Sequence, residues 1–145
     1  MNTFSPLADS KSPCDTPPPR SLRVLCIDDD ELVLESMKDF LAHFGHQVGV
    51  ASGGKRGIEV FCTAILKSEP YDVVITDMNM PDVSGYAVAQ AIKTESPDTP
   101  VILITGAGNT SWDAGSISAS VDATVNKPVR MKELNDLLLR MAGPA

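Results

Sequence analysis

Residues 71–85, YDVVITDMNMPDVSG, form the stretch that decides the fold of this chain. The run from Val73 to Thr76 is short, β-branched and unalternating, and this pattern predicts a strand buried on both faces of a parallel sheet. The run stops at Asp77, and Pro81 and Gly85 follow as turn signals. A carboxylate directly after such a strand lies at the rim of an α/β sheet, where sheets of this kind bind ligands.

Similar apolar runs recur on both sides of this stretch, and segments with helical periodicity separate them. We expect strands at residues 22–27, 47–51, 73–76, 100–105 and 121–125, and helices at residues 31–44, 54–65, 84–94 and 131–141. Asp30 is the expected N-cap of the first helix, and Gly45 is expected to end it. Strands that alternate with helices at this spacing predict an α/β fold with a parallel sheet and helices on both of its faces.

The apolar positions in these segments predict which side of each helix faces the core. The predicted inward residues are Val33, Met37, Phe40, Leu41 and Phe44 in the first helix, Ile58, Phe61 and Ile65 in the second, Val88, Ala91 and Ile92 in the third, and Leu134, Leu137, Leu138 and Met141 in the last. Residues 106–120, GAGNTSWDAGSISAS, occupy the place of a further helix, but their Gly, Ser and Thr content opposes one. We expect a frayed or shifted element there.

The composition fits one globular domain and argues against several classes of function. The chain has 145 residues, of which 43% are hydrophobic and 21% charged, so it can build an ordinary core. The net charge of −7 argues against a nucleic-acid-binding surface, which needs clustered Lys and Arg. No apolar stretch approaches the roughly 20 residues of a membrane span, and the N-terminus lacks the pattern of a signal sequence. We therefore expect a cytoplasmic protein with no membrane partner.

The proline-rich N-terminus differs from the rest of the chain. Residues 1–20 carry five prolines among Ser, Asp and Lys, which predicts a disordered tail ahead of a domain at residues 21–145. Cys26 and Cys62 lie among apolar residues and are interpreted as core side chains, not as metal or redox groups. His43 and His46 flank the end of the first helix and are predicted to lie at the surface.

Polar side chains follow four of the predicted strands. Asp28 and Asp29 end the first strand, Asp77 the third and Thr105 the fourth, while Lys127 lies just beyond the fifth. Because parallel strands place their carboxyl ends on one edge of the sheet, these five side chains are expected to converge on one pocket. A single acidic residue after a strand is usually a cap or a loop residue, but five polar groups at matching strand ends favour a functional site.

The residue types in this pocket indicate phosphoryl chemistry with a hard metal ion. Clustered carboxylates repel one another and are stabilised by a cation, and their oxygen atoms suit Mg²⁺. The hydroxyl of Thr105 and the ammonium group of Lys127 suit a phosphoryl group. Beside a metal ion and an ammonium group, Asp77 can act as a nucleophile toward phosphorus and form an aspartyl phosphate.

Four motifs in this order resemble the receiver domain of two-component response regulators. They are IDDD at residues 27–30, DMNMPDVSG at 77–85, VILITG at 101–106 and NKP at 126–128. The resemblance extends over residues 22–142, and the chain looks most like the single-domain type typified by the chemotaxis response regulator. It implies a flavodoxin-like, doubly wound, five-stranded parallel sheet in the order 2-1-3-4-5.

The resemblance also implies a role for each residue of the pocket. Asp77 would be the phosphoacceptor, Asp29 would ligate Mg²⁺ directly, and Asp28 would do so mainly through water. The implied remainder is the backbone carbonyl of Asn79 as a metal ligand, Thr105 and Lys127 as groups that bind the phosphoryl group, and a cis peptide bond before Pro128. The expected donor is a sensor histidine kinase or a histidine phosphotransfer protein, and the expected output is through an unknown downstream protein. The chain would then be a stand-alone phosphoacceptor and not a dedicated enzyme.

Two other interpretations compete with this one. Thr124 stands where the family usually has an aromatic residue, so a receiver-fold interaction module that phosphorylation does not switch remains an alternative. A Mg²⁺-dependent phosphatase with Asp77 as transient nucleophile is a second alternative, but that class needs a second acid where this chain has Asn79.

Overall fold

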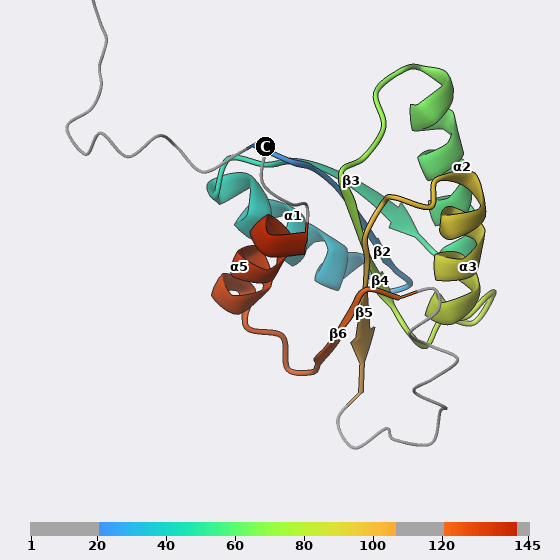
Figure 1. Cartoon of the computed structure of the whole chain (residues 1–145). Coiled ribbons are helices and arrows are strands. Elements are labelled where there is room, and N and C mark those ends of the chain that lie inside the picture. The colour runs from blue at the N-terminus through green and yellow to red at the C-terminus, as the bar shows by residue number, and fades with distance from the viewer. Residues whose placement is uncertain (1–20, 107–120, 142–145) are drawn as a thin grey trace, which may run out of the picture.

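The computed structural model describes residues 21–106 and 121–141, and these residues build a five-stranded parallel sheet (Figure 1). Its strands, in chain order, are β2 (Arg23–Asp28), β3 (Gln47–Ser52), β4 (Val73–Asp77), β5 (Val101–Thr105) and β6 (Ala123–Asn126). Their spatial order is β3-β2-β4-β5-β6, and every neighbouring pair is parallel. The predicted order 2-1-3-4-5 of the flavodoxin-like fold is therefore confirmed.

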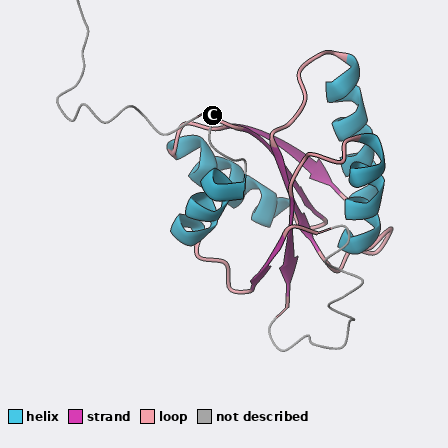
Figure 2. Ribbon diagram, in the orientation of Figure 1, coloured by secondary structure: helices cyan, strands magenta, loops and turns pink. Residues whose placement is uncertain are grey.

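Helices cover both faces of this sheet. The helix α1 (Glu31–His43) packs with α5 (Met131–Met141) on one face, whereas α2 (Gly54–Leu66) and α3 (Gly85–Glu95) cover the other (Figures 1 and 2). Each face has its own apolar cluster, and the central strands β4 and β5 contribute side chains to both. The edge strands are less buried than the centre, which explains why the run that ends in β6 is the weakest of the five in the sequence.

Local sequence signals set the ends of these helices. The carboxylate of Asp30 accepts a hydrogen bond of 2.9 Å from the Leu32 N–H and caps α1, as predicted. Gly45 follows the helix with a φ of +95°, a conformation that a residue with a Cβ rarely adopts. The hydroxyl of Ser84 caps α3 by accepting from the Ala87 N–H at 3.1 Å.

Two predicted helix faces were wrong in part. In α1 the buried residues are Leu34, Met37 and Leu41, while Val33 and Phe40 are 38% and 39% exposed. The aromatic ring of Phe40 instead packs against that of Phe44, with 5.3 Å between the ring centroids. In α3 the buried small residue is Ala89, not Ala91. These helices carry apolar residues on more than one side, so hydrophobicity alone does not fix the side that faces the sheet.

The surface prediction was also wrong for His46, which is buried. Its Nδ1 accepts a hydrogen bond from the Leu22 N–H at 3.1 Å, which places the ring proton on Nε2. The Nε2–H group then donates to Asn135 Oδ1 of α5 at 2.6 Å. The imidazole thus joins the residue before β2, the turn after α1 and the helix α5, which are distant in the sequence.

Replacing Asn135 with Ala is expected to lower the free energy of unfolding by about 1–3 kcal/mol, because the buried Nε2–H of His46 loses its acceptor. Urea unfolding measures this change. The matched control is Asp136→Ala at the next, exposed position of the same helix, which should change stability by less than about 0.5 kcal/mol. Equal effects of the two substitutions would contradict the bridging role of His46.

Several predictions fall outside the described residues. They are the tail at residues 1–20 and most of the segment predicted at residues 106–120. Within the described part, Cys26 is buried, as predicted, and burial raises the pKa of its thiol to about 12. Cys62 is only half-buried. Among the helices that the structure describes, none is both long and apolar enough to cross a membrane.

Candidate functional site

Three carboxylates gather at the carboxyl edge of the sheet. Asp28 ends β2, Asp29 follows it and Asp77 ends the neighbouring strand β4, so the parallel pairing brings them together. One oxygen from each carboxylate lies within 4.8 Å of the others. Asp28 and Asp77 are each 4% exposed, whereas Asp29 is open to solvent. The cluster therefore forms a small acidic pocket in which two carboxylates are buried and the third faces solvent.

Burial makes negative charge costly in this pocket. It raises the pKa of Asp28 to about 6, with a further upward contribution from the charge of Asp77. The Asp30 N–H donates to Asp28 Oδ1 at 2.9 Å and lowers that pKa in part. A hard divalent cation would relieve the same repulsion, and all three donors are carboxylate oxygens, the ligand type that Mg²⁺ prefers. The donor set thus fits a magnesium ion.

Lys127 completes the charged part of the site from the loop after β6. Its Nζ lies 3.1 Å from Asp77 Oδ1, and the hydrogen bond to Asp77 is the main cause that raises the pKa of the lysine. The backbone holds it in place, because the Lys127 N–H donates to the Thr105 carbonyl at 2.9 Å. The next peptide bond, Lys127–Pro128, is cis.

Thr105 lies at the end of β5 and is 1% exposed. Its hydroxyl donates a hydrogen bond of 2.8 Å to Asn126 Oδ1, and the two residues are register partners in the pair of β5 with β6. The sequence reasoning missed Asn126, although its position beside Lys127 at the end of the last strand was a usable signal.

The two polar pairs belong to different faces of the sheet. Along β5, Leu103 packs in the cluster with α2 and α3, and Ile104 in the cluster with α1 and α5. Strand alternation then assigns Thr105 and its partner Asn126 to the α2/α3 side. Asp77 lies two residues after Ile75, which packs in the cluster with α1 and α5, so Asp77 belongs to that side of the sheet. Its partner Lys127 contacts it there. The hydroxyl and the carboxylate thus start on opposite sides at neighbouring strand ends.

The first turn of α2 is bonded to both sides of the acidic pocket. The Gly53 N–H donates to the backbone carbonyl of Asp28 at 3.1 Å. From the loop after β4, the Asp82 carboxylate accepts from Gly54 N–H at 3.1 Å and from Lys55 N–H at 2.9 Å. These bonds, with one from the Val83 N–H, lower the pKa of Asp82. Sequence reasoning missed Asp82, because its partners are far away along the chain.

Asn79 lies in the same loop, two residues after Asp77, and its side chain is exposed. That its backbone carbonyl ligates a metal ion stays a prediction. The loop itself is anchored at both ends, since Met78 N–H donates to the Ile104 carbonyl at 2.9 Å and Gly85 N–H to the Met78 carbonyl at 2.8 Å.

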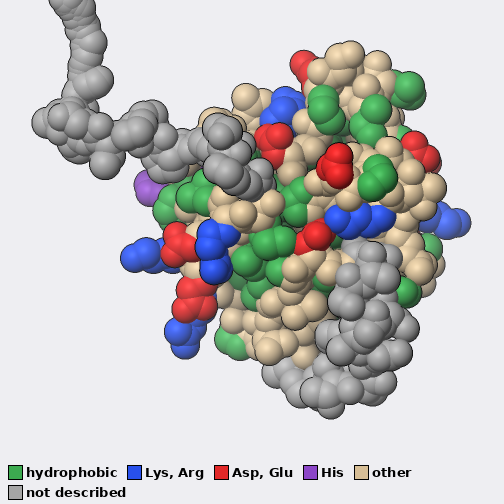
Figure 3. Space-filling model, viewed as in Figure 1, with side chains coloured by type: hydrophobic (Ala, Val, Ile, Leu, Met, Phe, Trp, Pro, Cys, Tyr) green, Lys and Arg blue, Asp and Glu red, His purple; other side chains and the backbone are tan. Residues whose placement is uncertain are grey.

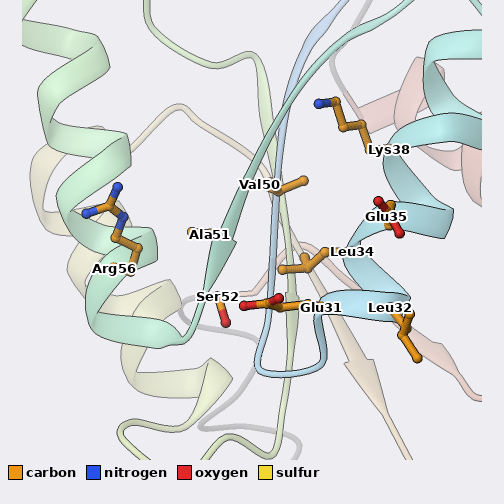
Figure 4. Close-up of a pocket in the computed structure, with 9 residues that line it drawn as sticks. All are labelled: Glu31, Leu32, Leu34, Glu35, Lys38, Val50, Ala51, Ser52 and Arg56. Carbon is orange, nitrogen blue, oxygen red and sulfur yellow. The ribbon is translucent and has the colours of Figure 1, made fainter.

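Other surfaces of the protein indicate a ligand less clearly than the acidic pocket does. A groove between α1 and the edge strand β3 is lined by Glu31, Glu35 and Lys38 from the helix, by Val50, and by Arg56 of α2 (Figure 4). It mixes both signs of charge and includes none of the three clustered carboxylates. Where Figure 3 shows described residues, acidic and basic side chains are likewise interspersed, and these residues form no continuous basic patch of the kind that binds nucleic acid.

Comparison with known proteins gives a consistent family. Residues 24–139 match the model of the response regulator receiver domain. The chain is 27% identical over 113 residues to the response regulator MprA of Mycolicibacterium vanbaalenii, and 31% identical over 119 residues to the two-component response regulator ORR26 of Oryza sativa subsp. japonica. These matches cover 78% and 82% of this chain, but 47% and 20% of the relatives. The chain therefore spans about half the length of MprA and less of ORR26.

Solved structures agree with this result. A response regulator receiver domain protein from Clostridium thermocellum matches with a TM-score of 0.74 and 30% identity, covering 83% of this chain and 93% of that one. The response regulator TrrA from Thermotoga maritima, in complex with Mg²⁺-BeF, matches with a TM-score of 0.68 and 28% identity, covering 83% and 98%.

Proposed function

The chain belongs to the family of response regulator receiver domains, and on that premise we propose that it accepts a phosphoryl group from a phosphohistidine onto Asp77 and signals through a protein partner. The observation that carries the proposal is the 3.1 Å contact of Lys127 Nζ with Asp77 Oδ1 beside the cluster of three carboxylates. This arrangement offers one nucleophile with an ammonium group on one side and, on the other, carboxylates that would hold a cation. The chain acts as a phosphoacceptor with at most slow self-hydrolysis.

The transfer uses groups that the pocket already contains. A carboxylate oxygen of Asp77 attacks phosphorus, and the new O–P bond forms as the P–N bond to histidine breaks. The imidazole of the donor leaves in its neutral form, with a proton from solvent on its other ring nitrogen. Lys127 stays beside Asp77 and offsets negative charge on the transferring group. Thr105 offers a hydroxyl donor to a phosphoryl oxygen once it turns away from Asn126.

Asp28, Asp29, Asp77 and the backbone carbonyl of Asn79 would hold Mg²⁺. When bound, the ion supplies positive charge that neutralises phosphoryl oxygens during the transfer. The complex of the related TrrA with Mg²⁺-BeF supports this assignment. Asp77 would be a buried ligand whose position the end of β4 fixes, Asp29 would ligate the ion directly from the open side, and the buried Asp28 would do so mainly through water.

An apolar groove beside the pocket supports a protein as phosphoryl donor. It is lined by Leu32 and Val33 of α1, Ile104, Pro128 and Met131, next to Asp28 and Lys127. Leu32 is 75% exposed, and exposed apolar side chains that gather beside a reactive group are typical of a protein-docking surface. A sensor histidine kinase or a histidine phosphotransfer protein would present its phosphohistidine from such a surface.

The direct test is incubation of the protein with Mg²⁺ and either acetyl phosphate or a phosphorylated histidine kinase. Intact mass should increase by one phosphoryl group, and the label should be lost in base and map to the peptide that contains Asp77. Labelling that is independent of Mg²⁺, or that maps elsewhere, would overturn the proposal. A protein that stays unlabelled with both donors would favour the interaction module that phosphate does not switch.

Magnesium binding is expected to weaken as the pH falls through about 6, the value to which burial raises the pKa of Asp28. Below that pKa the carboxyl group holds a proton that Mg²⁺ must displace. In metal-free protein the sign is opposite. The native state binds this proton more tightly than the unfolded chain does, so the contribution of Asp28 to stability declines as the pH rises from its ordinary pKa through about 6.

Melting temperatures measured with and without Mg²⁺ at about pH 5 and about pH 7 check this expectation. The rise caused by Mg²⁺ should be clearly larger at the higher pH, and Asp28→Asn should remove most of the difference. A rise of equal size at both values would contradict the role of Asp28 in the metal site.

A further inference from the structure

The hydroxyl of Thr105 is already committed to a partner. It is buried, it has one proton to donate, and it donates that proton to Asn126 Oδ1 at 2.8 Å. A hydroxyl can serve one strong acceptor at a time. Any phosphoryl oxygen on Asp77 that needs this donor must therefore compete with the side-chain carbonyl of Asn126.

The two acceptors that compete for this hydroxyl lie on opposite faces of the sheet. Thr105 and Asn126 share the side that carries Leu103, whereas Asp77 and Lys127 share the side that carries Ile75 and Ile104. The hydroxyl must rotate around the end of β5 to reach the carboxylate side. The Lys127 N–H is bonded to the Thr105 carbonyl, which ties the backbone of β5 to the residue after β6 and leaves rotation of the side chain as the smaller change.

From this geometry we propose that Asn126 is a positioning residue that holds the Thr105 hydroxyl in the resting state and gives it up when Asp77 is phosphorylated. The inference rests on the proposed function. Loss of the bond leaves the carboxamide of Asn126 without its partner on the exposed edge strand β6. The chemical change at Asp77 is thus transmitted to a polar side chain at the surface.

The surroundings of Thr124 support this route. Thr124 is the register partner of Leu103, lies two residues before Asn126 on the same side of β6, and is exposed. With a short side chain at this position, β6 presents no aromatic ring beside Leu103 that could follow the movement of Thr105. Instead, the hydrogen bond between Thr105 and Asn126 of β6 forms or breaks as the hydroxyl changes direction.

The sign of the expected effect separates this role from a merely structural one. If Asn126 competes for the hydroxyl, removing its carbonyl should make the phosphorylated state easier to reach. Asn126→Val keeps a residue suited to a strand but offers no acceptor, and should tighten the binding of beryllofluoride, a phosphoryl mimic, by about 3- to 10-fold. A residue that only stabilised the fold would give weaker binding when replaced.

The experiment measures the dissociation constant of beryllofluoride by ¹⁹F NMR at saturating Mg²⁺. Asn126→Asp keeps the acceptor and adds negative charge, so it should bind more weakly than wild type. Thr124→Val is the matched control on the same side of the same strand and should match wild type. In a Thr105→Val background, Asn126→Val should have no effect, because the hydroxyl for which the two acceptors compete is gone.

A second measurement uses the unchanged protein. The side-chain NH₂ resonances of Asn126 should shift when Mg²⁺ and beryllofluoride are added together, but not with Mg²⁺ alone. Two results would overturn this inference while leaving phosphorylation of Asp77 intact. One is unchanged or weaker binding of beryllofluoride by Asn126→Val, and the other is an Asn126 resonance that does not shift when beryllofluoride binds. Failure of the wild-type protein to bind the mimic would instead overturn the proposed function itself, and this inference with it.

Discussion

Asp77→Asn is expected to reduce phosphate incorporation from acetyl phosphate by at least about a hundredfold, the order seen when a nucleophile is removed. The amide has nearly the shape of the carboxylate, so the fold should persist while the attacking oxygen is lost. The same change removes one of the three carboxylates from the cluster and should shrink the rise in melting temperature that Mg²⁺ causes. It should also let the pKa of Lys127 fall, because Asp77 is the main group that raises it.

Asp122→Asn is the matched control for this result. Asp122 also pairs with a lysine, through a 2.7 Å contact with Lys93 Nζ, but it precedes β6 at the amino edge of the sheet. That variant should incorporate phosphate and respond to Mg²⁺ as the wild type does. Intact-mass analysis after timed incubation gives the comparison, and equal labelling of Asp77→Asn and wild type would show that the phosphoacceptor has been assigned to the wrong residue.

Gly85→Ala is expected to lower the free energy of unfolding by about 3 kcal/mol, because the new Cβ would overlap the carbonyl oxygen of Asp77 and a methyl group of Leu103. A backbone carbonyl at a strand end cannot rotate away, and Gly85 N–H is itself bonded to the Met78 carbonyl. The start of α3 must therefore move away from β4. The loop that carries Asn79 joins these two elements, so weaker Mg²⁺ binding should accompany the loss of stability.

Gly106→Ala is the control, since a Cβ there meets nothing within 4 Å among the described residues. Its effect on stability should stay within about 0.5 kcal/mol. Urea unfolding of both variants measures the difference. If both glycines tolerated alanine equally well, the close approach of α3 to the end of β4 would not be a constraint on this fold.

The sequence predicted the structure best where the hydrophobic pattern and the position along the chain indicate the same element. The runs around Val74 and Ile102 are apolar without alternation because both sides of β4 and β5 are covered, so the strands and their carboxyl ends could be predicted. Once the ends were known, the convergence of Asp28 and Asp77 followed from parallel pairing.

The sequence was least informative about polar contacts between distant segments. The bonds of Asp82 to the start of α2 span 27 and 28 residues, and the bond of Thr105 to Asn126 spans 21. Polar residues in loops have many possible partners, and a single sequence does not say which one folding brings near. His46 was placed at the surface for the same reason, since its partner in α5 lies 89 residues away.

The bonds around the first turn of α2 have a consequence for how the protein opens. Asp28 holds Gly53 from one side of the pocket, and Asp82 holds Gly54 and Lys55 from the other. The end of β2 cannot separate from the loop after β4 unless at least one of these N–H groups loses its acceptor. Local unfolding of the acidic pocket and fraying of α2 at its N-terminus are therefore one cooperative event with a shared free-energy cost, although the chain places them in separate elements.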